Sequence, residues 1–269
     1  MVKNGAVHGI APFHVGLLPQ ATPKVALDPA GRDRNPVARK HRERKMTAFS
    51  DAAAEDYDRR IARMAPGYDL ALELVVALAH CCFPANARVL LAGSGTCAEL
   101  LALAAAGPGW RFTAVEPSAA MMAMAREKVA AAGLGDRVTL VEAMLDDAPL
   151  VEHDAALCAL VMHFVPDGAK PGFLAALATR LRPGAPLLLT EFADVGLPEG
   201  CYEGWLLDRG VEPAVVARAA DWRRRVWRPT TPEQGRDLAA RAGFTDFRNF
   251  FQALGFQGWL GFRAGAPSN

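Results

Sequence analysis

The chain has 269 residues, 51% of them hydrophobic, and a formal net charge of +1. This content suffices for one α/β domain of ordinary size, and the near-neutral charge gives no general reason to expect a nucleic acid or an acidic substrate. No apolar run reaches the roughly 18–20 residues that a membrane span needs. The five cysteines show no paired framework and the six histidines no metal-ligand spacing, so we expect no metal site and a reduced, cytoplasmic setting.

The first 45 residues differ from the rest in charge. They hold nine Lys or Arg against three Asp or Glu and close on the charged run 39–45. Prolines and glycines are frequent there, so we interpret residues 1–45 as a disordered basic tail in front of one domain at 46–265. A nucleic-acid arm is the alternative interpretation, and a solvated tail is favoured over it.

The rest of the chain alternates helices and apolar strands. Ser50-Asp51 can cap a helix that includes Tyr57 and ends at Pro66-Gly67, and a second helix runs from Asp69 to about Phe83. Strands are predicted at 88–92, 111–115, 138–142, 155–160 and 186–191, with helices at 98–106, 118–132 and 171–181. Strands separated by helices imply parallel pairing with right-handed crossovers.

The pattern changes after residue 192. Residues 199–226 look helical, a further helix spans 232–242, and 244–251 with 258–263 predict a closing antiparallel hairpin. Together the elements predict an α/β fold with a doubly wound, mostly parallel sheet of seven strands. Helical additions precede the first strand and follow the fifth.

The most informative stretch is 89–117. An apolar strand enters the turn Gly93-Ser94-Gly95, a helix follows, and a second strand ends at Glu116 before Pro117. Glycines let backbone approach a ligand, the helix N-terminus offers unpaired N–H groups, and an acid about twenty residues on can accept both ribose hydroxyl protons. Cys97 stands where a third glycine would pack around a pyrophosphate. This favours a single nucleoside over a dinucleotide, and leaves a ligand-free turn or a nicotinamide dehydrogenase as alternatives.

These residues resemble the class I S-adenosylmethionine (SAM)-dependent methyltransferases, which have a Rossmann-like sheet. Val141-Glu142 and the Leu181-Arg182-Pro183-Gly184 run before an apolar strand extend the resemblance. A narrower likeness, over most of 47–263, is to the carboxy-S-adenosylmethionine synthase group. Its marks are Pro66-Gly67-Tyr68, Leu160-Val161-Met162-His163-Phe164, and Ala242-Gly243-Phe244 leading to Phe250-Phe251-Gln252. The resemblance implies SAM as cofactor and methyl transfer as the activity.

The resemblance also implies cofactor contacts along the C-terminal ends of the strands. Gly93, Ser94 and Gly95 would line the amino-acid portion of SAM, and Glu116 would bind the ribose. The other implied contacts are Tyr68 over the methionine moiety, Ala159 under the sulfonium, and Pro117, Ser118, Met144 and Leu145 around the adenine.

One titratable group is placed for catalysis. His163 follows the fourth predicted strand, where acceptor contacts often fall in this fold, and an unperturbed histidine titrates near pH ~6.5. It is the candidate catalytic base, and a loop histidine that orders the local backbone is the alternative. Arg223–Arg225 either hold an anionic substrate or form a solvated helix face. The near-neutral domain charge favours a small-molecule acceptor and leaves RNA open, and the sequence does not indicate the oligomeric state.

Three positions depart from the resembled class. Leu91 and Met144 stand where acids are usual, and Cys97 where glycine is usual. An acid at 91 would contact the amino group of SAM, and its loss would cost ~1–3 kcal/mol. The synthases also grip an extra carboxylate with an arginine after the fifth strand, where this chain has Leu207 with Arg209 two residues on. We therefore favour ordinary SAM and methyl transfer. A SAM-binding protein without transferase activity and a carboxy-SAM-type tRNA-modification enzyme are the alternatives.

Overall fold

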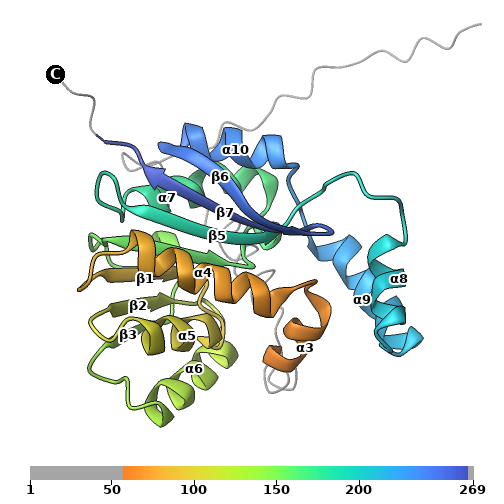
Figure 1. Ribbon diagram of the computed structural model, residues 1–269, viewed down its shortest axis with the longest axis horizontal. Helices are drawn as coiled ribbons and strands as arrows, with labels where there is room; N and C mark the ends of the chain where they lie inside the picture. Colours follow the sequence, from red (N-terminus) through yellow and green to blue (C-terminus); the bar gives the residue numbers. More distant parts are fainter. Residues whose placement is uncertain (1–56, 266–269) are drawn as a thin grey trace, which may run out of the picture.

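The computed structural model describes residues 57–265, so the predicted basic tail at 1–45 lies outside the described residues. A seven-stranded sheet has the order β3-β2-β1-β4-β5-β7-β6. Pairing is parallel from β3 to β5, and β7 runs antiparallel to both β5 and β6 (Figure 1). The doubly wound fold predicted from the sequence is confirmed. The strands are β1 (Arg88–Ala92), β2 (Arg111–Val115), β3 (Val138–Val141), β4 (Ala155–Ala159), β5 (Pro186–Phe192), β6 (Phe244–Ala253) and β7 (Phe256–Arg263).

Helices cover both faces of this sheet. Side chains alternate between the two faces along a strand, so Leu91 packs with α4, α5 and α6, whereas Leu90 packs on the side of α7 and α10. Burial on both faces explains why the parallel strands read as continuous apolar runs. The helices are α4 (Tyr68–Cys82), α5 (Ala98–Ala106), α6 (Ala119–Ala131), α7 (Lys170–Ala178) and α10 (Pro232–Arg241), with 3-10 turns η1 (Leu145–Asp147), η2 (Met162–Phe164) and η3 (Asp167–Ala169).

Three further helices lie beyond the C-terminal ends of the parallel strands (Figure 1). They are α3 (Tyr57–Met64), α8 (Cys201–Asp208) and α9 (Pro213–Val226). The sequence predicted one helical stretch at 199–226, and the structure divides it, because Gly210 takes a φ of +73° and Pro213 begins the next helix. Buried Leu206, Val211 and Val216 join the two helices into a small cap.

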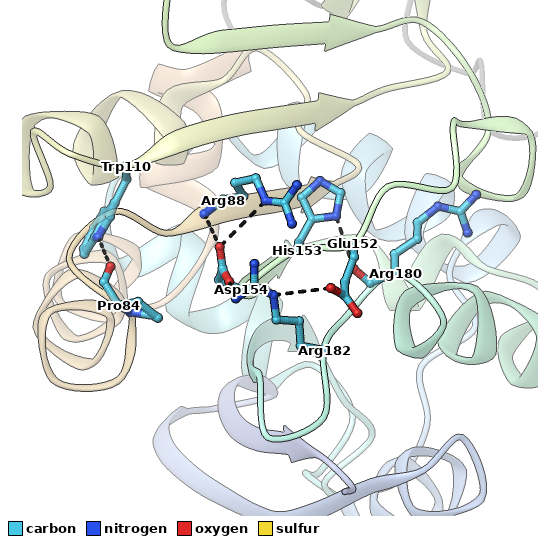
Figure 2. Close-up of polar contacts among 8 residues, drawn as sticks. All are labelled: Pro84, Arg88, Trp110, Glu152, His153, Asp154, Arg180 and Arg182. Atoms are coloured by element: carbon cyan, nitrogen blue, oxygen red, sulfur yellow. Dashed lines mark hydrogen bonds and ion pairs between the residues drawn. The ribbon is translucent and has the colours of Figure 1, made fainter. Parts of the chain in front are cut away.

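A polar network lies at the N-terminal ends of the central strands β1 and β4, at the other end of these strands from the three helices (Figure 2). The buried carboxylate of Asp154 accepts a hydrogen bond of 2.7 Å from the Arg88 backbone N–H and pairs with Arg182 at 2.5 Å. The Arg182 guanidinium also lies 3.4 Å from Glu152. This network therefore fixes the starts of β1 and β4 relative to the turn before β5, far along the strands from their C-terminal ends.

None of the helices within residues 57–265 combines the length and the apolar character needed to cross a membrane.

Candidate functional site

The turn after β1 is built by backbone geometry that favours glycine. Gly93 and Gly95 take φ values of +74° and +52°. A Cβ on Gly93 would lie 2.4 Å from a methyl carbon of Val161, so this position has no room for a side chain. The Gly93 and Ser94 amides both donate to the Val115 carbonyl, at 2.8 and 3.0 Å. The turn is thus folded back over the end of β2, where Glu116 follows.

Glu116 is held in place by two backbone amides. Its Oε2 accepts a hydrogen bond from Gly95 N–H and its Oε1 accepts one from Ser118 N–H, both at 2.9 Å. The side chain is 8% exposed, and burial raises the pKa of its carboxyl while the two amides oppose that shift. The structure therefore brings together three of the residues expected at the cofactor site.

The surroundings of Glu116 fit a ribose. A carboxylate offers about four acceptor positions, so two remain for a pair of sugar hydroxyls. A Cβ built on Gly95 would meet nothing within 4 Å, which leaves open space beside the carboxylate. Backbone without side chains next to a fixed acid is the arrangement that a nucleoside needs for close approach.

Cys97 shows why glycine is usual at its position in the resembled class. It is the N-cap of α5 and takes a φ of +64°, in the left-handed region that costs a side-chain-bearing residue ~1–2 kcal/mol. Its side chain is fully buried against the core. Leu91 is likewise a core residue, 2% exposed, and not an acid facing a ligand.

A pocket lies between α4, α5 and the ends of β4 and β5. It is a small pocket, with room for about one water molecule, and it is partly open to solvent. Tyr68 begins α4, and its hydroxyl donates a 2.6 Å hydrogen bond to Glu99 in the first turn of α5. The pocket lining also includes Leu157, Ala159, Thr190 and Phe256. Two expected residues, Tyr68 and Ala159, therefore share one pocket.

Glu99 and Asp58 were not predicted from the sequence. Burial raises the pKa of Glu99, whereas the hydrogen bond from Tyr68 lowers it. Asp58 on α3 accepts a 2.6 Å hydrogen bond from the Thr96 hydroxyl and pairs with Lys128 of α6. Helix α3 is thereby fastened over the glycine turn. An acid in the first turn of a helix belongs to no motif, so the sequence held no signal for either residue.

The four residues expected around the adenine differ in how far they are exposed. Ser118 is the N-cap of α6, where its hydroxyl accepts from the Met121 amide at 3.4 Å. Pro117 and Met144 are partly exposed, whereas the Leu145 side chain is buried in the core. Met144 is the N-cap of η1, just after the end of β3 at Val141.

His163 lies in a buried aromatic environment. It is 2% exposed, and burial, followed by the charge of Lys170, lowers the pKa of its imidazole to about 3. Its Nδ1 accepts a hydrogen bond of 3.4 Å from the Phe192 amide, and its ring centroid lies 4.6 Å from that of Trp227. These surroundings favour the alternative in which His163 orders the local backbone, because a catalytic base must reach the acceptor.

Arg223 and Arg225, two of the three candidate arginines at 223–225, make contacts within the protein. Arg223 pairs with Glu203 and stacks over Tyr202 at 4.9 Å, and Arg225 pairs with Asp221. Leu207, at the position where the synthases have an arginine, is 44% exposed. The guanidinium of Arg209 lies 5.0 Å from the Trp205 ring centroid.

Known proteins that are similar to this chain include SAM-dependent methyltransferases. A family model described as a methyltransferase domain matches residues 89–184. Among solved structures, the S-adenosylmethionine-dependent methyltransferase SibL superposes with a TM-score of 0.51 at 22% identity, over 66% of this chain and 50% of SibL. A SAM-dependent methyltransferase from Aquifex aeolicus has a TM-score of 0.57 at 16% identity, over 80% of this chain and 100% of that one. This chain thus spans half of SibL and all of the Aquifex protein.

The match over residues 89–184 and the sheet order support a methyltransferase domain with the Rossmann-like class I fold, for which SAM is the cofactor or substrate. Within that class the chain is similar over most of its length to carboxy-S-adenosyl-L-methionine synthases. The one from Campylobacter lari is 24% identical over 225 residues, covering 81% of this chain and 95% of that protein.

Proposed function

We propose that this protein transfers the methyl group of SAM to a small-molecule acceptor. The observation that supports it best is the Glu116 carboxylate, fixed by the amides of Gly95 and Ser118 at the C-terminal end of β2. SAM, when bound, supplies a methyl group on a positively charged sulfur that is an excellent leaving group. The protein's part is therefore alignment more than proton chemistry.

Each neighbouring element contributes one alignment task. Glu116 accepts the hydrogen bonds of the ribose diol, and the backbone of 93–95 lies against the amino-acid portion of the cofactor. Tyr68 covers the methionine moiety, and Ala159 leaves space under the sulfur. Ser118, Pro117, Met144 and Leu145 surround the adenine, with Leu145 contributing backbone because its side chain is in the core. His163 keeps the loop after β4 in shape through the Phe192 amide.

The cap formed by α8 and α9 supports a small, partly apolar acceptor. Tyr202 bonds the Met64 carbonyl at 2.5 Å, which ties the cap to α3. The ring centroid of Phe192 lies 5.9 Å from that of Tyr202 and 4.5 Å from that of Trp227. Residues 46–269 hold 21 Lys or Arg against 26 Asp or Glu, and this mildly acidic balance disfavours RNA.

A second candidate is carboxy-SAM chemistry, as in the relatives that match most of this chain. Its extra carboxylate needs a cation. The arginines near that position stack on Trp205 or pair with Glu203, and Leu207 supplies no charge. Ordinary SAM is therefore favoured.

A transfer assay separates these functions. The full chain is incubated with methyl-labelled SAM and either a desalted metabolite extract or total RNA, and the products are separated by mass. We expect S-adenosylhomocysteine to form and the label to enter the small-molecule fraction. Label in RNA would contradict the acceptor class, and an adenosyl product heavier than SAM by a carboxylate would support the second candidate. SAM binding without any product would favour a binding protein that lacks transferase activity.

A further inference from the structure

SAM carries a positive charge at one end of its methionine moiety, the α-ammonium group. Burying a cation is costly unless an anion pairs with it. Three acids lie near the glycine turn in the part of the chain that the structure describes: Asp58, Glu99 and Glu116. The position of each carboxylate decides which of them can take the ammonium.

Two of these acids are already engaged. Asp58 accepts the Thr96 hydroxyl and pairs with Lys128, so its charge is compensated within the protein. Glu116 accepts the Gly95 and Ser118 amides at the end of β2, in the place that suits the ribose. Neither is among the residues that line the pocket between α4 and α5.

Glu99 is the acid that faces this pocket. Its Oε1 accepts the Tyr68 hydroxyl at 2.6 Å, and a carboxylate has further acceptor positions to offer. Apart from Tyr68 and Thr190, the pocket is otherwise lined by apolar side chains, among them Ala71, Leu157 and Phe256. A carboxylate in such surroundings is poorly compensated, and burial raises its pKa accordingly.

The same pocket contains Ala159, the residue at the end of β4 that we place under the sulfonium. The methionine chain would therefore run from the sulfur at Ala159 toward Glu99. Leu91 is in the core and supplies no carboxylate, which leaves Glu99 as the acid along this path.

We propose that Glu99 binds the α-ammonium group of SAM and that the Tyr68 hydroxyl holds the Glu99 carboxylate in position. This inference rests on the proposed function as far as SAM binding is concerned. Glu99 is then a specificity residue, because adenosyl ligands that carry the amino acid bind more tightly than those that lack it.

The test compares two ligands that differ in the amino-acid part. S-adenosylhomocysteine has the ammonium, and 5′-methylthioadenosine lacks the whole amino acid. By calorimetry on the full chain, Glu99→Gln should weaken S-adenosylhomocysteine about tenfold to a hundredfold and 5′-methylthioadenosine less than about twofold. Tyr68→Phe should weaken the first ligand by a smaller factor. Glu142→Gln, an exposed acid that pairs with Arg126, is the matched control and should change neither affinity.

A second measurement keeps the test valid if Glu99→Gln folds poorly. The deamino analogue of S-adenosylhomocysteine removes the ammonium from the ligand side, so the wild-type protein should bind it about tenfold or more weakly. Where the variant folds, analogue and parent should bind it alike, as a double-mutant cycle requires. Equal affinity of the wild-type protein for analogue and parent, or equal losses for both ligands in Glu99→Gln, would overturn the inference. A wild-type protein that binds none of the adenosyl ligands would instead contradict the proposed function.

Discussion

The Gly95 amide donates a hydrogen bond of 2.9 Å to the Glu116 carboxylate, and this contact joins the turn after β1 to the end of β2. The Ser94 amide makes the same connection through the Val115 carbonyl at 3.0 Å. The acid that we propose to bind the ribose therefore also fixes the turn that we propose to line the cofactor. Removing the carboxylate should affect both ligand binding and the order of the turn.

Glu116→Ala is expected to weaken SAM binding at least tenfold. The variant removes the acceptor of the ribose hydroxyls and leaves the amides of Gly95 and Ser118 without their partner, and each such loss costs ~1–3 kcal/mol. Calorimetry measures the affinity, with Glu142→Ala as the control on an exposed acid. Unchanged affinity in Glu116→Ala would contradict our placement of the ribose.

A methyl group at Gly95 should act on the ligand more than on the fold. Gly95 and Gly133 have φ values of +52° and +66°, and a Cβ at either meets nothing within 4 Å. Each Gly→Ala variant should therefore lose a similar ~1–2 kcal/mol of unfolding free energy from backbone strain alone. Gly95→Ala should in addition weaken SAM binding at least tenfold, because its methyl group enters the space beside Glu116.

Urea unfolding and calorimetry on these two variants give the comparison. Gly133 ends α6 and faces no proposed ligand, so Gly133→Ala should bind SAM with wild-type affinity. If both variants bind SAM equally well, the open space at Gly95 does not belong to the cofactor.

Much of this fold could be predicted from the pattern of apolar residues along the sequence. Apolar runs at 88–92 and 155–160 predict buried parallel strands within a residue of their observed bounds, because both sides of each strand are covered by helices. The break at Gly210 was missed, although Gly210 and Pro213 stand three residues apart within the predicted stretch 199–226 and both disfavour the interior of a helix. Local pattern does not encode how a helix packs against its neighbours.

The site could be predicted only where backbone geometry demands particular residues. The glycine turn and the strand-end acid are such positions, and the structure brings Gly95, Glu116 and Ser118 together. The place of Glu99 in the site depends on how α5 packs against α4. Its contact with Tyr68 joins residues that are 31 apart in the chain, so local sequence does not indicate it. His163 looked accessible because it follows a strand, and its burial arises from Trp227, far along the chain.

The network at the amino ends of the strands should support stability without affecting the cofactor (Figure 2). Asp154→Ala removes the acceptor of the Arg88 amide and the partner of Arg182, so the unfolding free energy should fall by ~1–3 kcal/mol. Glu152→Ala removes the exposed partner of the same arginine and should cost less than ~1 kcal/mol. Urea unfolding measures both values. SAM affinity should stay within about twofold of wild type in each variant, and a large loss of affinity in Asp154→Ala would contradict the separation of the two edges.

The buried carboxyl of Glu191 should make stability fall as the pH rises toward neutrality. Burial raises its pKa from 4.5 to about 7, and the charge of Lys170 opposes the shift only in part. Between pH 4.5 and 7 the folded protein then holds a proton that the unfolded chain has released. The bound proton stabilises the folded protein fully below pH 4.5, and this stabilisation is lost as the pH rises through about 7. The total loss of unfolding free energy is ~3 kcal/mol. The pKa of His163 is lowered from 6.5 to about 3, so below pH 6.5 this residue makes stability rise with pH, opposite to Glu191.

Unfolding free energies of wild type and Glu191→Gln at pH 5, 6, 7 and 8 isolate the effect of Glu191, because His163 is present in both proteins. As the pH rises, the unfolding free energy of wild type should fall relative to that of Glu191→Gln. If the unfolding free energies of the two proteins change with pH in parallel, Glu191 does not bind the proton.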